Sequence, residues 1–148
     1  MLNGLLHTQA DWAGLILRLV LALVFFPHGA QKVLGWFGGY GYAGTMQFFT
    51  KSVGLPTPIA FLSIMAEFVG PIALVLGFGT RLAALLIAAV MVGAILKVHR
   101  GTGFFMNWTG QHQAGQEGYE YHLLVIAIAA ALLVTGGGVF SIDGLLAG

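Results

Sequence analysis

Ionisable side chains recur where the long apolar stretches of this sequence begin or end. His28 and Lys32 are four residues apart near the end of the first stretch, so they share one face if that stretch is helical. Lys97 and His99 end the third stretch, and His122 begins the fourth. Imidazole and ammonium groups can donate hydrogen bonds and protons to a carbonyl-bearing ligand. We therefore predict a shared polar site built from these residues.

Two further charges, Arg18 and Glu67, lie inside apolar stretches rather than at their ends. A charge at the centre of a membrane helix costs about 2.5 to 3.5 kcal/mol on insertion scales, so each needs a partner or a purpose. One interpretation pairs Arg18 with Glu67 across neighbouring antiparallel helices. The other gives Arg18 a structural role, as a clamp or as a side chain that extends back toward the interface near Trp12.

Histidine-rich sites can hold a metal ion, haem or an organic ligand. The histidines, at positions 7, 28, 99, 112 and 122, are far apart and form no H-E-x-x-H pair, so no metal site is predicted, while bis-histidine haem stays open. The chain has no cysteine, which excludes thiolate chemistry and iron–sulfur ligation. An apolar pocket rimmed by histidines, a lysine and a carboxylate also suits a lipophilic quinone, whose carbonyls accept hydrogen bonds and whose reduction consumes protons.

A glycine pattern, Gly39-Tyr-Gly41-Tyr-Ala-Gly44, imitates the G-x-G-x-x-G dinucleotide fingerprint. That fingerprint requires a preceding strand within a βαβ unit, whereas the preceding segment here is an apolar stretch of helical length. We therefore interpret the glycines as a turn that leaves a helix. Nucleic acid is not an expected partner either, because the net charge is only +1 and the basic residues are dispersed.

The composition predicts the elements that must position these residues. Hydrophobic residues make up 58% of the chain and charged residues 7%, far below the roughly 25% of soluble domains. Apolar runs recur at Ala13–Leu34, Thr57–Phe78, Leu82–Val98 and Tyr121–Val134. Because about 20 apolar residues span a bilayer as a helix, we predict an all-α, integral membrane four-helix bundle, with residues 1–148 forming one domain.

The connections between these runs differ in length. Gly35–Pro56 and Arg100–Glu120 are long, whereas Gly77–Arg81 is tight. Antiparallel helices would place both long connections on one face, where basic residues also outnumber those on the other, so the positive-inside rule favours a cytoplasmic position for this face. Within the first connection, Thr45–Val53 is expected to form a short helix at the membrane interface.

Several motifs together resemble those of the DoxX family. They are H-G-x-x-K-x-x-G-W-F-G-G at His28–Gly39, G-L-P at 54–56, L-G-F-G-T-R at Leu76–Arg81, G-F-F-x-N-W at Gly103–Trp108, E-Y-H-L-L at Glu120–Leu124 and G-G-G-V-F-S-I-D at Gly136–Asp143. The resemblance covers nearly the whole chain. It implies a small four-helix membrane protein of a group usually described as oxidoreductases, some of which belong to a thiosulfate:quinone oxidoreductase. The chain departs from the family near its end, where a G-P-G-R-Y-S-like turn is expected, and Asp143 therefore lacks an expected arginine neighbour.

We accordingly expect a membrane subunit of a quinone-linked oxidoreductase, located in a bacterial-type inner membrane. His28 and His122 would bond or protonate the quinone, Lys32 and Lys97 would stabilise developing negative charge, and Glu67 with Arg18 would form a buried polar connection. His99, Trp36 and Trp108 would complete the binding site.

The alternative is a non-catalytic membrane anchor or assembly partner for a soluble redox enzyme. The missing cysteines and the lack of a cofactor motif favour this alternative. Expected partners are membrane lipid and a soluble or membrane redox protein. Small residues along Ala83–Gly93 and Ala127–Ala131 also leave a homo-oligomer open.

Overall fold

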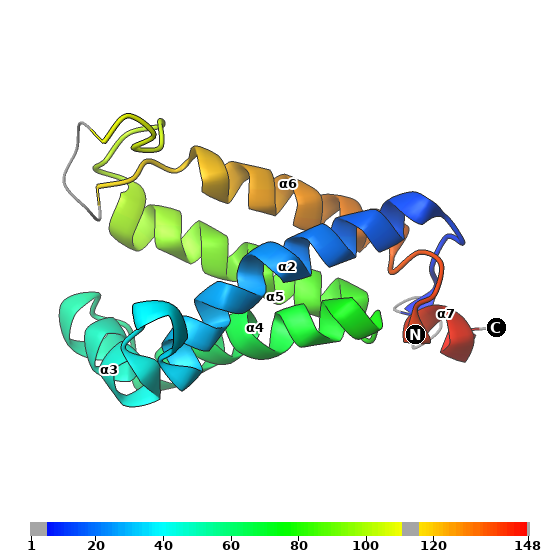
Figure 1. Cartoon of the computed structure of the whole chain (residues 1–148), viewed down its shortest axis with the longest axis horizontal. Coiled ribbons are helices and arrows are strands. Elements are labelled where there is room, and N and C mark those ends of the chain that lie inside the picture. Colours follow the sequence, from blue (N-terminus) through cyan, green and yellow to red (C-terminus); the bar gives the residue numbers. More distant parts are fainter. Residues whose placement is uncertain (1–5, 111–115, 148) are drawn as a thin grey trace.

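The computed structural model describes residues 6–110 and 116–147, and this part of the chain contains helices and no strands (Figure 1). His112 lies outside the described residues. The long helices are α2 (Trp12–Leu34), α4 (Thr57–Leu76), α5 (Thr80–Ala94) and α6 (Glu120–Thr135). The shorter elements are the 3-10 helix η1 (Trp36–Gly38), α3 (Gly41–Gln47), the π-helix η2 (Phe48–Ser52), the π-helix η3 (Ile95–His99), which continues α5, and α7 (Ile142–Ala147). The predicted all-α class is confirmed.

Three helices of the described chain are long and apolar enough to cross a membrane: Trp12–Leu34, Thr57–Leu76 and Thr80–His99. The fourth apolar helix, α6, forms where it is predicted but has only 16 residues. At 1.5 Å per residue it is about 24 Å long, somewhat short of the hydrocarbon thickness of about 30 Å. It ends at Gly136, which has φ 79 and ψ −160 and opens a run of glycines. The count of full-length spans is therefore three rather than four.

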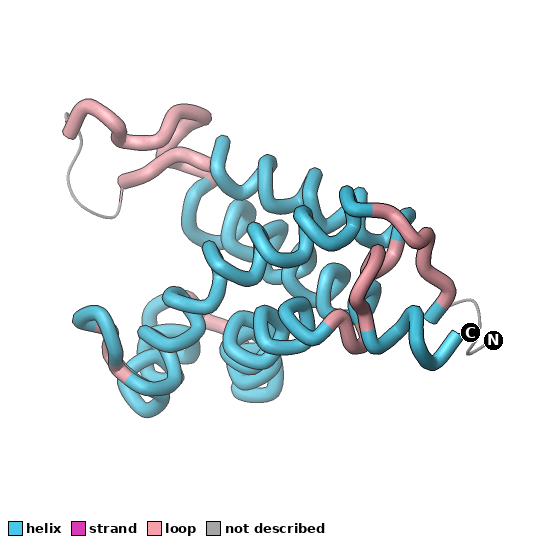
Figure 2. The backbone as a smooth tube through the Cα atoms, turned by 45° about the vertical axis from the view of Figure 1, so that its right-hand side comes forward, coloured by secondary structure: helices cyan, strands magenta, loops and turns pink. Residues whose placement is uncertain are grey.

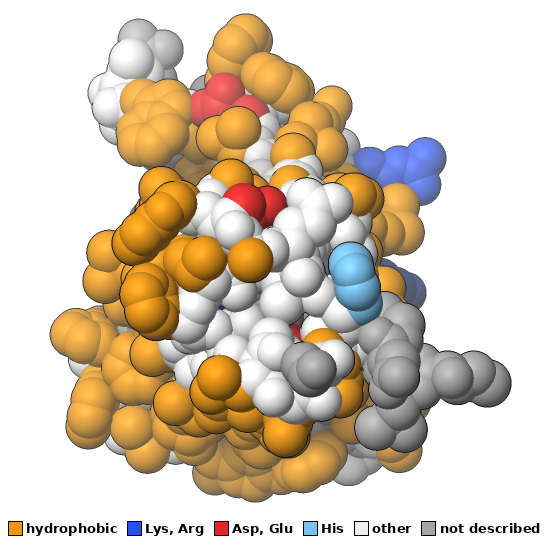
Figure 3. Space-filling view, turned by 90° about the vertical axis from the view of Figure 1, so that its right-hand side faces the viewer, with side chains coloured by type: hydrophobic (Ala, Val, Ile, Leu, Met, Phe, Trp, Pro, Cys, Tyr) orange, Lys and Arg blue, Asp and Glu red, His pale blue; other side chains and the backbone are white. Residues whose placement is uncertain are grey.

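The long helices run antiparallel around a shared apolar core (Figures 1 and 2). Leu21, Phe25, Leu74, Ile87 and Leu132 are all buried in it. Large apolar side chains also cover the outside, as a lipid-facing surface requires, and Figure 3 shows them around the end of the molecule that carries the termini. Both long connections lie at the opposite end, as antiparallel helices require (Figure 1).

The first long connection contains a helix, although this helix begins earlier than expected. α3 and η2 together run from Gly41 to Ser52, whereas the sequence pattern predicts Thr45–Val53. The glycines of the G-x-G-x-x-G pattern follow two helices rather than a strand, and Gly41 begins α3. A side chain at Gly39 would overlap the backbone of Gln31, with its Cβ 2.6 Å from the carbonyl carbon. This glycine thus allows the connection to fold back onto the end of α2.

Arg18 does not pair with Glu67, so that interpretation is wrong. Its guanidinium is buried and donates to carbonyl oxygens at the end of α4 and in the segment after α6. The five bonds are Nε to Gly137 at 2.9 Å, Nη1 to Leu74 at 2.9 Å and Val75 at 2.6 Å, and Nη2 to Val139 at 3.2 Å and Phe140 at 2.7 Å. All five N–H groups are satisfied, and the positive charge lies at a helix C-terminus, where it is favourable. Arg18 therefore acts as a structural clamp that joins α2 to the end of α4 and to the segment after α6.

Other polar side chains cap helix ends near Arg18. Arg81 donates to the carbonyls of Leu133 and Val134 at the end of α6, at 2.9 and 3.0 Å. Asp143 accepts from the backbone amides of Gly79 and Thr80 at 2.7 and 2.8 Å, which caps the start of α5. Asp143 therefore has backbone partners, and the arginine whose charge lies near it is Arg18 rather than one from the expected turn. The charged side chains at this end form hydrogen bonds with the backbone N–H and C=O groups of helix ends, which have no partners within their own helix.

Gly29 determines how α2 and α4 pack. A Cβ at Gly29 would lie 2.6 Å from both the carbonyl carbon of Glu67 and the Cα of Phe68, so the two backbones touch here. This register places Glu67 beside Gly29. Arg18 is eleven residues earlier in α2, about 16 Å along the helix axis. That separation is the physical reason why Arg18 meets the end of α4 rather than Glu67.

Replacing Gly29 with alanine is expected to lower the thermal stability of the detergent-solubilised protein. The new methyl group cannot fit between two backbones, and overpacking of this kind costs about 1 to 3 kcal/mol. Gly93→Ala is the matched control, because a Cβ at Gly93 has no atom within 4 Å. Equal melting temperatures for the two variants would contradict the assigned helix register.

Replacing Arg18 with methionine should lower stability much further. Backbone carbonyls at the end of α4 and after α6 would lose their donors, at about 1 to 3 kcal/mol for each buried group left unsatisfied. Arg100→Met provides the control, because Arg100 is exposed at the opposite end of the molecule. Melting curves followed by circular dichroism would measure both effects, and a loss no larger than that of the control would contradict the clamp.

Candidate functional site

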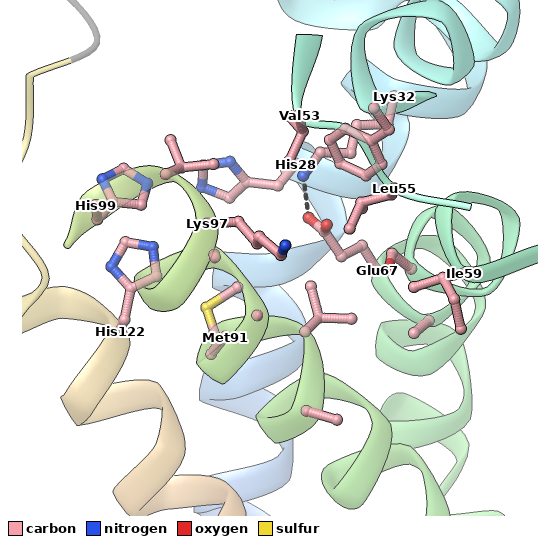
Figure 4. Close-up of a pocket in the computed structure, with 18 of the residues that line it drawn as sticks. His28, Lys32, Val53, Leu55, Ile59, Glu67, Met91, Lys97, His99 and His122 are labelled. Atoms are coloured by element: carbon pink, nitrogen blue, oxygen red, sulfur yellow. Dashed lines mark hydrogen bonds and ion pairs between the residues drawn. The ribbon is translucent and has the colours of Figure 1, made fainter. Parts of the chain in front are cut away.

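A cavity of about 590 Å³ lies at the end of the molecule that carries the long connections. Most of its wall is apolar. The polar and ionisable residues that line it are His28, Lys32, Ser63, Glu67, Lys97, His99, Glu117, Tyr121 and His122. They come from α2, α4, η3, the second long connection and α6, and Figure 4 shows the labelled members converging on one space. A concave apolar site with a few convergent polar groups is typical of ligand-binding pockets.

On one side of the cavity, Lys32 and Glu67 form an ion pair. The carboxylate of Glu67 is almost fully buried, at 4% exposure, whereas the Lys32 side chain is 25% exposed. A carboxylate in the apolar interior needs a partner of opposite charge, and the contact of Gly29 with Glu67 brings Lys32 into range. Glu67 thus has Lys32, one helical turn after His28, as its partner in place of Arg18.

Across the cavity, His99 and His122 form a second polar group. Their ring centroids are 4.3 Å apart and the planes are inclined by 47°. The Nδ1 atom of His99 lies 2.8 Å from the carbonyl oxygen of Glu117. A carbonyl oxygen can only accept, so Nδ1 carries the proton and Nε2 of the neutral ring is an acceptor. The backbone of the second long connection thereby sets the tautomer of His99.

Two buried polar atoms of the cavity wall lack a hydrogen-bond partner within the described chain: Nδ1 of His122 and the hydroxyl of Tyr121. The rings of His28, Tyr121 and His122 follow one another at centroid distances of 6.4 and 5.8 Å. Buried polar groups are nearly always hydrogen-bonded in native proteins. These two atoms therefore border the cavity as groups whose hydrogen bonds the described chain does not supply.

Lys97 supplies a positive charge between these two groups. It lies in the π-helix η3, which continues α5 and also carries His99, and π-helical turns are frequent at functional sites. Figure 4 shows its side chain extending into the cavity between the histidine pair and Glu67. Within the described residues, Lys97 has no recorded ion pair or hydrogen bond, which leaves its ammonium group for a ligand.

The cavity does not include every residue that we expect in the site. Arg18 is at the opposite end of the bundle, and Trp36 and Trp108 do not line the cavity. Trp36 is 53% exposed, and the indole N–H of Trp108 donates to Glu120 at 2.6 Å. Glu120 also accepts from the backbone amide of Met106 at 2.8 Å, so it holds the second long connection against α6. The two tryptophans belong to the exposed loop surface rather than to the cavity wall.

Tyr121, Ser63 and Glu117 line the cavity but are not among the predicted site residues. Tyr121 is next to His122 in the E-Y-H-L-L motif, and this adjacency is a sequence signal that it lies near the site. Ser63 lies four residues before Glu67, one helical turn away, which is a weaker signal. Glu117 offers no signal, because the carbonyl that binds His99 belongs to the backbone. Within the described residues, no three histidine or acidic side chains are placed to hold a metal ion.

Comparisons with known proteins agree with this architecture. The family model described as DoxX matches residues 13–100. A protein of Bacillus subtilis (strain 168) named "Putative oxidoreductase CatD" is 32% identical over 129 residues, which cover 87% of this chain and 83% of that protein. The inner membrane protein YqjF of Escherichia coli (strain K12) is 29% identical over 136 residues, 92% of this chain and 93% of that protein. YphA, an inner membrane protein of the same organism, is 30% identical over 132 residues, 87% of this chain and 86% of that protein. No solved structure matches the chain.

Loss of one partner of the Lys32–Glu67 pair is expected to destabilise the protein more than loss of both. Lys32→Met leaves a buried carboxylate unpaired and should cost about 2 to 4 kcal/mol, whereas Lys32→Met combined with Glu67→Gln removes both charges and should restore most of the loss. Denaturant unfolding of the wild type, both single variants and the double variant gives the coupling energy. Additive effects of the two substitutions would contradict the pairing.

Proposed function

Because this chain belongs to the DoxX family, we propose that it acts as a membrane subunit of a quinone-linked oxidoreductase. The chain is a multi-pass membrane protein, and its relatives YqjF and YphA are inner membrane proteins. The name of the Bacillus subtilis relative, 32% identical, supports an oxidoreductase function. The observation that carries the proposal is the apolar cavity in which His28, Lys97 and the His99–His122 pair converge.

The residues of the cavity fit a quinone in size and in chemistry. A volume of about 590 Å³ lies within the range of small-molecule sites, and the wall is mainly apolar. When bound, a quinone supplies two-electron, two-proton chemistry, for which the protein provides position and protons. The unpaired polar atoms of Tyr121 and His122 match a ligand with carbonyl acceptors and, once reduced, hydroxyl donors.

Each polar group has a distinct role in this proposal. Lys97 donates a hydrogen bond to a quinone oxygen and stabilises negative charge that develops there, because no acidic residue of the described chain forms an ion pair with it. His28 and His122 bond or protonate the ring oxygens. The Lys32–Glu67 pair keeps a charged carboxylate at the cavity wall, which His28 also lines. Electrons come from a redox partner of the complex.

A second candidate, a non-catalytic anchor for a soluble redox enzyme, is favoured by the exposed aromatic residues of the long connections. Trp36, Tyr40, Phe105 and Trp108 are 53%, 82%, 75% and 80% exposed. Aromatic residues of this kind are enriched in protein interfaces and also in the interfacial zone of membranes. The surface they form would dock a partner without requiring chemistry in the cavity.

Purified wild-type protein in nanodiscs is expected to bind a benzoquinone that carries a decyl tail, saturably and in one-to-one ratio, by isothermal titration calorimetry. His28→Ala and Lys97→Met should each weaken binding by about tenfold, as loss of one hydrogen bond to a charged or polar partner predicts. His7→Ala is the matched control, because His7 lies at the opposite end of the molecule. Absence of saturable binding, or equal effects of all three substitutions, would overturn the proposal.

The two candidates are separated by a variant with alanine at His28, His99 and His122. A catalytic cavity requires that this variant abolish quinone reduction by the native membrane complex. A pure anchor would leave the rate unchanged.

A further inference from the structure

One wall of the cavity is open to the lipid-facing surface of the protein. Ile59 and Leu62 of α4 and Leu86 of α5 line the cavity, and yet they are 49%, 57% and 42% exposed. A residue that faces both the cavity and the outside marks an opening. Because the outer surfaces of these spans contact acyl chains, the opening between α4 and α5 leads into the bilayer.

The packing of α4 against α5 explains where this opening begins. A Cβ at Gly70 of α4 would lie 3.2 Å from Cδ1 of Ile87, so the two helices are in close contact at this level. Toward the long connections, a Cβ at Gly93 of α5 has no atom within 4 Å, although Gly93 lines the cavity. The helices therefore touch near Gly70 and Ile87, and a slot extends from about this level toward the long connections. We call the part of the cavity lined by Leu62, Leu86, Ala89 and Gly93 the α4–α5 slot.

The slot has a polar end and an apolar end. Its residues on α5, at positions 86, 89 and 93, follow one helix face at steps of three or four residues, and the same step leads to Lys97 in η3. Eleven residues separate Leu86 from Lys97, which corresponds to about 16 Å along the helix. The ionisable groups gather at the Lys97 end, next to His99 and Glu67, and the remaining length is apolar (Figure 4).

We propose that the ligand is a quinone with a long apolar tail, that it enters from the bilayer through the α4–α5 slot, and that its tail stays in the slot while its ring lies beside Lys97. This inference rests on the proposed function and adds the route of entry and the position of the tail. A compact polar solute would leave the slot unfilled, whereas an alkyl tail matches its length and its apolar wall. Gly93 is the specificity-determining residue, because any side chain at this position would fill the space reserved for the tail.

The same apolar chemistry could come from the acyl chain of a lipid, so the experiment must separate the two sources. The probe is a benzoquinone with a decyl tail that ends in a photoreactive diazirine, and the comparison probe is a diazirine fatty acid of similar length. Full-length protein in nanodiscs is illuminated with either probe, and the labelled peptides are identified by mass spectrometry. The competitor is an excess of the unlabelled decyl quinone.

The quinone probe is expected to label the segments Thr57–Leu76 and Thr80–Ala94, and the competitor should reduce this labelling at least about fivefold, as competition for one site predicts. Gly93→Leu should abolish it, whereas Val92→Leu should leave it unchanged, because Val92 is 44% exposed and does not line the cavity. Ala89→Phe, with Leu85→Phe as its control, repeats the test at a second position. Melting temperatures verify that each variant is folded.

Three results would overturn the inference. If the fatty acid labels the slot as strongly and excess quinone does not displace it, the slot is an ordinary lipid contact. If the decyl quinone binds saturably but labels other segments, or if Gly93→Leu has no effect, the route is wrong while the proposed function stands. If no quinone binds saturably, the proposed function itself fails.

Discussion

The guanidinium of Arg18 holds one end of this protein together, because a charge buried among apolar helices is stable only when all of its donors are satisfied. Its five N–H groups bind carbonyls from the end of α4 and from the segment that follows α6, so that α2, α4 and the chain after α6 meet at one point. Arg81 and Asp143 cap the ends of α6 and α5 nearby. Toward the other end α2 and α4 stay in contact at Gly29, whereas α4 and α5 leave space between them, and the cavity forms there.

The two ends of the molecule therefore use charge differently. At the end that carries the termini, Arg18, Arg81 and Asp143 bind backbone atoms. At the cavity, Glu67 has a side-chain partner in Lys32, Lys97 has no acidic partner in the described chain, and the Nδ1 of His122 lacks a hydrogen bond. Polar side chains in a membrane protein are costly, and those of the cavity wall do little to cap helices. Their presence therefore favours a role in function. The proposed quinone chemistry and the slot between α4 and α5 both derive from this difference.

Stability and access also depend on glycines with opposite surroundings. Gly29 is needed because the backbones of α2 and α4 touch, which brings Lys32 to Glu67. A Cβ at Gly93 would have no atom within 4 Å, and the missing side chain leaves the slot open. Glycine thus allows close contact between α2 and α4 and leaves space between α4 and α5. Only the surroundings of each glycine distinguish the two roles.

The sequence by itself determined the helices and their order. Continuous apolar runs and the glycines and prolines between them predicted α2, α4, α5 and α6 to within a few residues, because burial in lipid demands long apolar helices. The antiparallel order also predicted that His28, Lys97 and His122 approach one end. Only the tertiary structure decided which charges meet, since the partner of Glu67 depends on the axial register of α2 against α4, and that register is set by the contact at Gly29. The same holds for Arg18, whose partners are backbone carbonyls and carry no signature in the sequence, and for the cavity, whose walls come from segments that only packing brings together.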